Sequence, residues 1–353
     1  MRNFKTFITK WTQWEHWPTF LFYAPLVPFF LYKIIRTGNP VYFLVTNPGI
    51  LYSGCGSESK YKTLLLIPEK LRPKSVLIPK GTPFSTILER IQKEKINYPL
   101  ISKPDIGFRG YLVKKIENQQ DLENYFSRIK TDIIIQEFVA FQHEIGVFYH
   151  RIPGEEKGKI TSITIKKYLS LTGDGKSTLS ELILADERAF LYFDLLKNIH
   201  QENMETILLK GEAKILSFIG NHSKGTQFLD GKKLINRQLE ITIDNLNHQI
   251  DGWFYGRIDM KYDTMSDLFL GKNFKIIEIN GIISEPTHIY DASGDATYFD
   301  AVRTIKSHWK IIDRIALKNH KQFGISYPNV KSFVQNMLTL RTHAGMLKQM
   351  NKS

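Results

Sequence analysis

Two strand-like stretches in the second half of the chain each place polar side chains on one face. Residues two apart in a strand face the same way, so GRIDM aligns Arg257 with Asp259, and IIEIN aligns Glu278 with Asn280. If the two strands pair as a hairpin, a guanidinium, two carboxylates and an amide oxygen converge. Such oxygen ligands suit Mg²⁺, which binds few protein carboxylates together with water and substrate phosphates. A cross-strand salt bridge is the alternative that these four residues leave open.

Strand and helix signals alternate irregularly around these stretches. Apolar runs such as DIIIQEFVA, EIGVFYHRI and KITSITIKKY predict strands, and helices are expected between some of them at about 120–130, 177–200 and 239–250. Earlier, VYFLVT and TLLLIP are short strand candidates. Because no fixed-period repeat joins these elements, we expect an α+β fold rather than a regular βαβ alternation. The tail after residue 298 is expected to be helical.

The stretch LTGDGKSTLSELI comes close to a phosphate-binding P-loop. That motif needs G-x-x-x-x-G-K-[ST], so that backbone N–H groups wrap the phosphates, and Ser170 stands where its first glycine should be. Serine does not easily adopt the glycine-only dihedral angles of the tight turn. A P-loop NTPase that uses GDGKST therefore stays an alternative function rather than the favoured one.

The order of the short motifs is more specific than any one of them. YPLISKP, a loop, IIQEFV, HEIGVF, GRIDM and IIEIN follow one another, and this succession resembles the ATP-grasp superfamily, typified by D-alanine–D-alanine ligase. The resemblance covers roughly residues 80–295. It implies an ATP-grasp fold, in which two α+β subdomains grip ATP. It also implies a carboxylate–amine ligase that uses ATP and one or two Mg²⁺ ions and forms an acyl phosphate.

The resemblance further implies which residues bind the nucleotide. Lys103 would contact the phosphates under a lid formed by the loop DIGFRG, 105–110, where Gly107 and Gly110 allow close backbone approach. Glu144 would bind the ribose hydroxyls. The segment beside adenine would consist of Gln136, Glu137, Phe138 and Val139.

The catalytic and metal-binding residues follow from the same resemblance. Arg257 would stabilise the transferring phosphoryl group and the acyl phosphate, and Asp259, Glu278 and Asn280 would hold Mg²⁺. GDGKST is similar to a turn and helix in the ATP-grasp region of cyanophycin synthetase, which implies that it forms a turn and a helix cap. The same likeness implies that one nearby lysine points at phosphate or substrate, and the candidates are Lys166, Lys167 and Lys176. After the metal strand, four residues of GIISEPTHIYD could orient an amine or a carboxylate: Glu285, His288, Tyr290 and Asp291. A structural role for His288 is the alternative to a catalytic one.

The chain departs from ATP-grasp ligases before the motifs begin. Such ligases usually carry a full α/β domain there, whereas here only about 45 residues follow a hydrophobic leader. In these residues, the segment Ser57–Lys60 is expected either to be solvated or to contact substrate. We therefore expect four parts: an aromatic, basic leader 1–37, a short substrate-side subdomain 38–85, an ATP-grasp domain 86–297 and basic C-terminal helices 298–353.

The net charge of +13 lies at the two ends of the chain. Residues 1–37 hold five basic residues and one acidic residue, and residues 301–353 hold ten basic residues and one acidic residue, so the middle is neutral. Anionic lipid attracts such segments at about 1 kcal/mol per basic residue, and nucleic acid would attract them too. The leader favours lipid, because residues 17–32 are uncharged and rich in aromatics, as at a bilayer interface.

The leader therefore predicts either an interfacial membrane anchor or a proline-broken hairpin that packs on the body. Its uncharged run is short for a straight span, which needs about 20 residues. A single cysteine, Cys55, fits a reducing compartment. We expect a cytoplasmic protein that can lie peripherally on the cytoplasmic face of the inner membrane. Its partners would be a small-molecule or lipid-linked carboxylate and an amine acceptor, without nucleic acid; a non-catalytic, membrane-associated nucleotide-binding protein is a further alternative.

Overall fold

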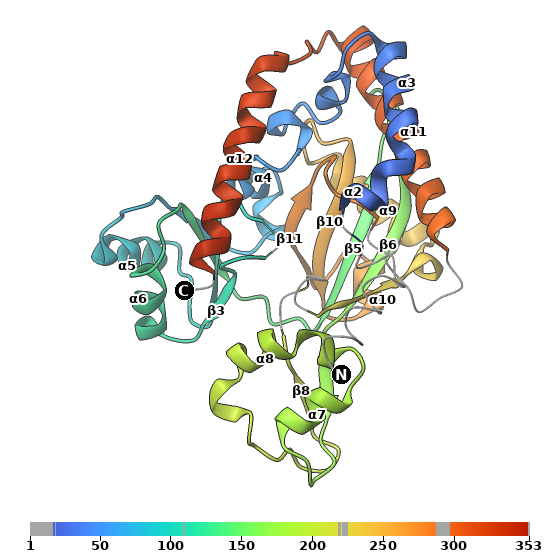
Figure 1. Ribbon diagram of the computed structural model, residues 1–353. Coiled ribbons are helices and arrows are strands. Elements are labelled where there is room, and N and C mark those ends of the chain that lie inside the picture. Colours follow the sequence, from blue (N-terminus) through green and yellow to red (C-terminus); the bar gives the residue numbers. More distant parts are fainter. Residues whose placement is uncertain are drawn as a thin grey trace.

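Two antiparallel sheets organise the molecule (Figure 1). The computed structural model describes residues 17, 19–108, 110–217, 220, 225–286 and 297–351. The first sheet has the strand order β1-β4-β2-β3, and the second has the order β11-β10-β5-β6-β9. Sheets with helices grouped around them confirm the expected α+β class.

The first sheet belongs to a small unit that includes two helices. Its strands are β1 (Ser75–Ile78), β2 (Leu100–Pro104), β3 (Lys114–Ile116) and β4 (Ile133–Glu137). Helices α5 (Phe84–Lys93) and α6 (Gln119–Phe126) pack with them around one apolar core. Strand β4 is central, and its three consecutive isoleucines are fully buried. β-Branched residues suit such a strand because they pack well on a pleated surface.

The second sheet carries the larger core. Its strands are β5 (His143–His150), β6 (Lys159–Lys167), β9 (Gln227–Asp230), β10 (Tyr255–Tyr262) and β11 (Phe274–Asn280). The helices near it are α4 (Lys60–Leu65), α9 (Arg237–Asn247) and α10 (Met265–Phe269). Residues of β5, β6, β10, β11 and the three helices share one apolar cluster that includes Leu64, Leu239 and Trp253. The cluster fixes β10 and β11, the two strands that carry GRIDM and IIEIN.

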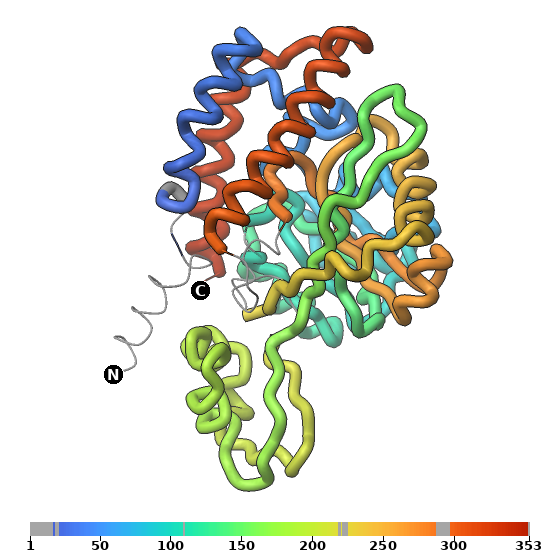
Figure 2. Tube along the Cα trace, turned by 90° about the vertical axis from the view of Figure 1, so that its right-hand side faces the viewer, coloured from blue at the N-terminus to red at the C-terminus, as the bar shows by residue number. Residues whose placement is uncertain are grey.

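A third unit projects from the end of β6, as Figure 2 shows. It contains β7 (Ser170–Thr172), α7 (Leu179–Ala185), α8 (Phe193–Ile199) and β8 (Ala213–Ile215), around an apolar core of its own. The single helix expected over 177–200 is wrong, because the chain turns extended at Asp186. The carboxylate of Asp186 accepts hydrogen bonds from the backbone N–H groups of Arg188 (3.0 Å) and Ala189 (2.7 Å). These bonds stabilise a break that periodicity alone does not reveal.

The two ends of the described chain form a helical layer together. Helices α2 (Thr19–Tyr23) and α3 (Val27–Thr37) lie beside α11 (Tyr298–Phe323), and α12 (Val330–Met350) returns across the molecule (Figure 1). Lys33 forms a buried ion pair with Asp313, which also accepts a hydrogen bond of 2.5 Å from the Tyr42 hydroxyl. The described part of the leader thus packs on the body. Among the residues described, no helix is both long and apolar enough to cross a bilayer.

Two early strand expectations are wrong. VYFLVT forms the 3₁₀ helix η3 (Tyr42–Val45), and TLLLIP mostly belongs to α4 and the turn that follows it. In a short apolar run, periodicity cannot distinguish a strand from a helix. A local contact favours the helix in α4, because the Ser59 side chain accepts a hydrogen bond from Lys62 N and caps the helix. The expected division at residues 37, 85 and 297 stays a prediction.

His150, at the end of β5, should make stability depend on pH. Burial, then the charges of Lys159 and Arg314, lower the pKa of His150 to about 4, against the effect of Glu155. Its buried Nδ1 has no hydrogen-bond partner among the described residues. An unfolded histidine takes up its proton near pH 6.5, whereas folded His150 does so only near pH 4. The folded state therefore loses stability as the pH falls from about 6.5 to 4.

We expect His150→Phe to flatten this pH dependence by up to about 3 kcal/mol in the free energy of unfolding, measured by urea titration between pH 7 and 4. The exposed His248 provides the matched control, and His248→Phe should leave the slope as in the wild type. Equal slopes for wild type and His150→Phe would contradict the lowered pKa.

Candidate active site

The predicted hairpin is present, and its register brings the four polar residues together. Arg257 lies opposite Asn280, and Asp259 lies opposite Glu278, with a bulge directly after Asp259. On the other side of β10, Asp259 lies opposite Gly146 of β5. A Cβ atom at position 146 would come within 2.8 Å of Arg257 Cδ and 3.1 Å of Asp259 Oδ1. Only glycine at this position therefore leaves room for the pair.

Asp259 is the most heavily bonded carboxylate of the group. Arg257 donates from Nε to Oδ1 at 2.9 Å and from Nη2 to Oδ2 at 3.0 Å, and Asn280 Nδ2 donates to Oδ2 at 3.0 Å. Lys166 Nζ of β6 lies 3.0 Å from Oδ1. Burial opposes ionisation of Asp259, but Arg257 and Lys166 outweigh it and lower its pKa to about 2. Asp259 is therefore anionic at neutral pH, and the salt-bridge alternative is present in this structure.

Glu144 and Lys166 continue the cluster across β5 and β6. They are cross-strand partners, and Lys166 Nζ donates to Glu144 Oε1 at 2.6 Å. The Tyr168 hydroxyl donates to the other carboxylate oxygen at 2.5 Å. Glu144 and Lys166 are both buried. A buried charge is tolerated only when it is paired and hydrogen-bonded. Both Glu144 and Lys166 meet this condition.

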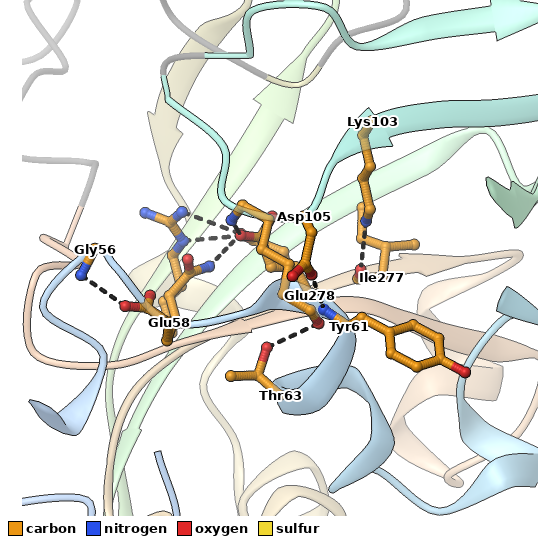
Figure 3. Close-up of polar contacts among 12 residues, drawn as sticks. Gly56, Glu58, Tyr61, Thr63, Lys103, Asp105, Ile277 and Glu278 are labelled. Atoms are coloured by element: carbon orange, nitrogen blue, oxygen red, sulfur yellow. Dashed lines mark hydrogen bonds and ion pairs between the residues drawn. The ribbon is translucent and has the colours of Figure 1, made fainter. Parts of the chain in front are cut away.

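Two lysines surround Glu278. Lys60, the first residue of α4, forms an ion pair with Glu278. Lys103 Nζ donates to Gln136 Oε1 at 3.1 Å and to the Ile277 carbonyl at 3.4 Å; Figure 3 shows the contact with Ile277. Burial lowers the pKa of Lys103 to about 8; Glu278 opposes this change, and the charge of Lys60 adds to it.

Lys60 is a site residue that the sequence left undecided. Asp105 positions it: the carboxylate accepts a hydrogen bond from Tyr61 N at 2.8 Å (Figure 3). It accepts another from Ser59 Oγ at 2.9 Å. The Asp105 carbonyl accepts another from Lys60 N at 3.1 Å. Asp105 opens the expected lid loop, so the start of α4 is tied directly to this loop. Of the two expectations for Ser57–Lys60, the arrangement favours contact with the site over full solvation.

The C-terminal helix holds the same loop. The Ile106 carbonyl lies 2.8 Å from His343 Nε2 of α12, and Leu112 N donates to Asn351 Oδ1 at 3.0 Å. Arg109, within the expected lid, lies outside the described residues. The loop is thus attached to both α4 and α12 in this conformation.

A pocket of about 350 Å³ between the two sheets collects these residues. It is lined by all the described residues that were expected to bind nucleotide or metal, and by Lys166 and Arg257: Lys103, Gly107, Gly110, Gln136, Glu137, Phe138, Val139, Glu144, Lys166, Arg257, Asp259, Glu278 and Asn280. Glu285, expected to orient a substrate, lines a different cavity. His288, with Tyr290 and Asp291, lies outside the described residues. The volume falls within the usual range for small-molecule sites, roughly 300–1,000 Å³.

Sequence reasoning missed several residues of this pocket. Lys115 of β3 and Lys261 of β10 place their ammonium groups 4.8 Å and 5.6 Å from the centre of the Phe138 ring. Tyr111, which directly follows the lid loop, also lines the pocket. The alternation of β10 could have indicated Lys261, which is two residues beyond Asp259 on the same face. Lys115 and Tyr111 carry no comparable signal.

Positive charge exceeds negative charge in this pocket. Among the described residues, six cationic and four acidic side chains line it. Because a cleft with low-dielectric walls focuses such a field, the pocket favours a polyanionic ligand. Its chemistry suits nucleotide phosphates better than a cationic or neutral ligand.

The donor set fits Mg²⁺ only as part of a shared site. Among the described residues, no group of three or more His, Cys, Asp or Glu side chains could hold a metal by itself. Asp259 and Glu278 are cross-strand partners, and Asn280 supplies an amide oxygen. Mg²⁺ commonly uses one or two carboxylates plus substrate phosphates and water. The residues present therefore fit a magnesium ion that arrives with a phosphate ligand.

GDGKST forms a turn and a helix cap. The backbone N–H groups of Lys176 and Ser177 both donate to Asp174 Oδ1 at 2.8 Å, and Thr178 caps α7 in a capping box with Glu181. Backbone N–H groups that a P-loop would direct at phosphate are thus used by Asp174. Lys176 and Lys167 are exposed and do not line the pocket, whereas Lys166 does.

Comparisons with known proteins give structural likeness alone. No protein-family profile matches the chain, and no curated protein matches its sequence. A bifunctional glutathione synthetase from Pasteurella multocida is similar with a TM-score of 0.37 and 11% identity, over 70% of this chain and 36% of that one. The chain thus spans about a third of that enzyme.

Two further solved structures are similar at the same level. The VanG D-Ala:D-Ser ligase from Enterococcus faecalis gives a TM-score of 0.40 and 15% identity, over 77% of this chain and 64% of that one. D-alanine–D-alanine ligase from Bacillus anthracis gives 0.40 and 13%, over 75% and 71%. The expected likeness to such ligases is thus found as a likeness of structure. At these scores it carries no argument about the site, which rests on its own geometry.

Lys166 and its neighbour Lys167 form a matched pair for a stability test. Lys166→Met would leave Glu144 and Asp259 buried with one cation fewer, so we expect the free energy of unfolding to fall by about 3 kcal/mol in urea titrations. Lys167→Met removes an exposed charge and should change it by less than about 0.5 kcal/mol. Similar effects of the two substitutions would show that the buried cluster does not depend on Lys166.

Proposed function

We propose that the protein is an ATP-dependent carboxylate–amine ligase that works through an acyl phosphate with Mg²⁺. The observation that carries this proposal is the pocket between the two sheets, because it gathers the described residues that were expected to bind nucleotide and metal, together with Lys166 and Arg257. An excess of positive charge in the same pocket supports a polyphosphate ligand. The substrate would be a small-molecule or lipid-linked carboxylate, and the acceptor would be an amine.

In this proposal the nucleotide lies between the two sheets. Lys103 binds its phosphates beneath the loop that contains Gly107 and Gly110. The adenine ring lies beside the segment 136–139, where the Phe138 ring offers an apolar face. Glu144, held by Lys166 and Tyr168, is oriented toward the ribose hydroxyls. Polar groups fixed in this way need little rearrangement when the ligand arrives.

The chemistry then requires positioned positive charge more than covalent help from the protein. A carboxylate oxygen attacks the γ-phosphorus, and the bond between this phosphorus and the oxygen of ADP breaks. The amine nitrogen next attacks the acyl carbon, phosphate leaves, and the amine loses a proton to give the amide. Arg257, held in place by Asp259, stabilises negative charge in both steps.

Magnesium would be held by Asp259, Glu278 and the Asn280 amide oxygen, and it would offset charge on the transferring phosphate. Lys60 now pairs with Glu278, so the lysine and the metal would share this carboxylate or compete for it. Displaced from Glu278, Lys60 would still lie under the lid loop, because its Cε is close to Gly107. It would then add a cation beside the phosphates.

This function predicts a metal-dependent response to nucleotide. ATP should raise the melting temperature only when Mg²⁺ is present, because a ligand that binds the folded state stabilises it. Glu278→Gln should lower turnover on the order of 100-fold, measured as ADP release with a panel of amino acids, peptides and polyamines. Lys176→Ala is the matched control and should respond to Mg·ATP as the wild type does. Loss of the response in Lys176→Ala alone would favour the P-loop alternative.

We also propose that the protein lies peripherally on an anionic membrane surface. Part of the leader is core, since Phe22 and Leu26 are buried against Ala301 and Ile305 of α11. The outer side of α3 is different: Val27, Leu31 and Ile35 follow one another at four-residue spacing and are 50%, 55% and 80% exposed. Basic residues of α11, Arg303 and Lys306, are close in sequence to the α11 residues that contact the leader. An apolar stripe accompanied by basic residues suits an interfacial helix.

Flotation with anionic vesicles at low salt tests this placement. The wild type should float, and Leu31→Glu/Ile35→Glu should remain in solution, because charge on the apolar stripe prevents its insertion. Ile241→Glu/Leu270→Glu changes two apolar residues that are similarly exposed elsewhere, and this control should still float. If the wild type itself stays in solution, α3 is simply a surface helix.

A further inference from the structure

A second cavity lies between the helical layer and the far ends of β10 and β11. It has a volume of about 470 Å³. Its walls include Phe30 of α3, Phe43 of η3, Trp309 and Ile312 of α11, and Ile282, which follows β11. The Trp309 ring is packed edge-on against Phe30 at 4.8 Å and against Phe43 at 5.5 Å between ring centres. The cavity therefore has an ordered aromatic and aliphatic wall.

The same two strands run from the nucleotide pocket to this cavity. Tyr255 lines the cavity, and Arg257, two residues further along β10 on the same face, lines the pocket. On the neighbouring strand, Asn280 lines the pocket and Ile282 lines the cavity. Arg257 Nη1 also lies 3.4 Å from the carbonyl of Glu285, another residue of the cavity wall. The two spaces are thus consecutive along one sheet face.

The cavity is poor in groups that could satisfy a polar ligand. Glu285 is the single charged side chain among the described residues that line it. The Tyr255 hydroxyl and His308 Nδ1 lie 2.9 Å apart and bond to each other. Burial, and to a smaller extent Glu58, raises the pKa of the Cys55 thiol to about 12, as expected for an apolar environment. A polar substrate group placed here would lose its hydration without compensation.

We propose that this cavity binds the hydrocarbon part of an amphipathic substrate whose polar end reacts beside Arg257. The inference rests on the proposed ligase function, because it takes Arg257 as the point of reaction. An apolar cavity is costly to leave empty, and it excludes water. An apolar group that enters it is therefore bound favourably. Its continuity with the pocket fixes which end of the substrate is apolar. The substrate class is then an alkyl or acyl-chain compound with a terminal carboxylate or amine, rather than a small polar amino acid.

Cys55 offers a direct report on occupancy, since it is the only cysteine of the chain and lines the cavity. The experiment measures, by intact mass spectrometry at alkaline pH, the rate at which the thiol-selective reagent methyl methanethiosulfonate modifies the full-length protein, because the raised pKa of Cys55 leaves little reactive thiolate at neutral pH. Octanoate and octylamine are the long-chain probes, and acetate and ethylamine are the matched short ones. We expect at least one long-chain probe to slow the modification about tenfold or more, and the short probes to leave the rate unchanged.

A substitution in the wall separates filling of the cavity from general effects of the probes. Ser284→Trp should fill the space and remove the difference between long and short probes, with folding checked by circular dichroism. Ser266→Trp, at an exposed position of α10, should keep the difference seen in the wild type. If Ser284→Trp does not fold, the comparison of long and short probes on the wild type decides alone.

Three results would overturn the proposal. These are equal rates with and without long-chain probes, equal protection by short and long probes, and a Cys55 thiol that reacts in the urea-unfolded protein but not at all in the ligand-free folded protein at the same alkaline pH, which would mean that the chain itself closes the cavity. No nucleotide is present in these reactions. Failure of the ligase function would instead appear as the absence of a Mg·ATP melting shift while the protection of Cys55 persists.

Discussion

The buried carboxylate of Asp259 is the interaction on which the site depends. It joins three strands, since Arg257 and Asp259 lie on β10, Lys166 on β6 and Asn280 on β11. The pairing compensates for the burial of these charges, and it fixes the guanidinium where phosphoryl chemistry would need it. Gly146 makes the arrangement sterically feasible. The charge cluster therefore fixes the geometry of the pocket, on a sheet that its apolar core holds together.

The part of the site that lies on strands could be predicted from the sequence because strand periodicity is simple. Arg257 and Asp259 share a face by their spacing alone, and the hairpin with Glu278 and Asn280 has the expected pairing. Lys60 could not be assigned in this way. Its position depends on how Asp105 holds the start of α4, a contact between residues 44 to 46 positions apart in the chain. Periodicity also fails for two other features. The 3₁₀ helix η3 within VYFLVT depends on the burial of its side chains, and the break at Asp186 depends on hydrogen bonds to the Asp186 carboxylate.

The helical layer from the two ends of the chain forms one wall of the second cavity. Lys33, Asp313 and Tyr42 tie α3, α11 and η3 together, and the layer closes an apolar cavity against the ends of β10 and β11. This cavity lies beside the pocket between the two sheets, along the same sheet face. Selection of the substrate would then depend on apolar walls rather than on polar contacts. The exposed apolar stripe of α3, which belongs to this layer, would suit access by a substrate with a hydrocarbon chain.

The central claim is that the pocket between the two sheets binds ATP, and photolabelling tests it most directly. The protein is irradiated with 8-azido-ATP and Mg²⁺, digested, and the modified peptides are identified by mass spectrometry. Because the azide is attached to the adenine ring, the account predicts that the label falls on the peptide that contains Gln136–Val139, and that excess ATP prevents it. A label on the peptide that contains the GDGKST turn, or labelling that excess ATP does not reduce, would contradict it.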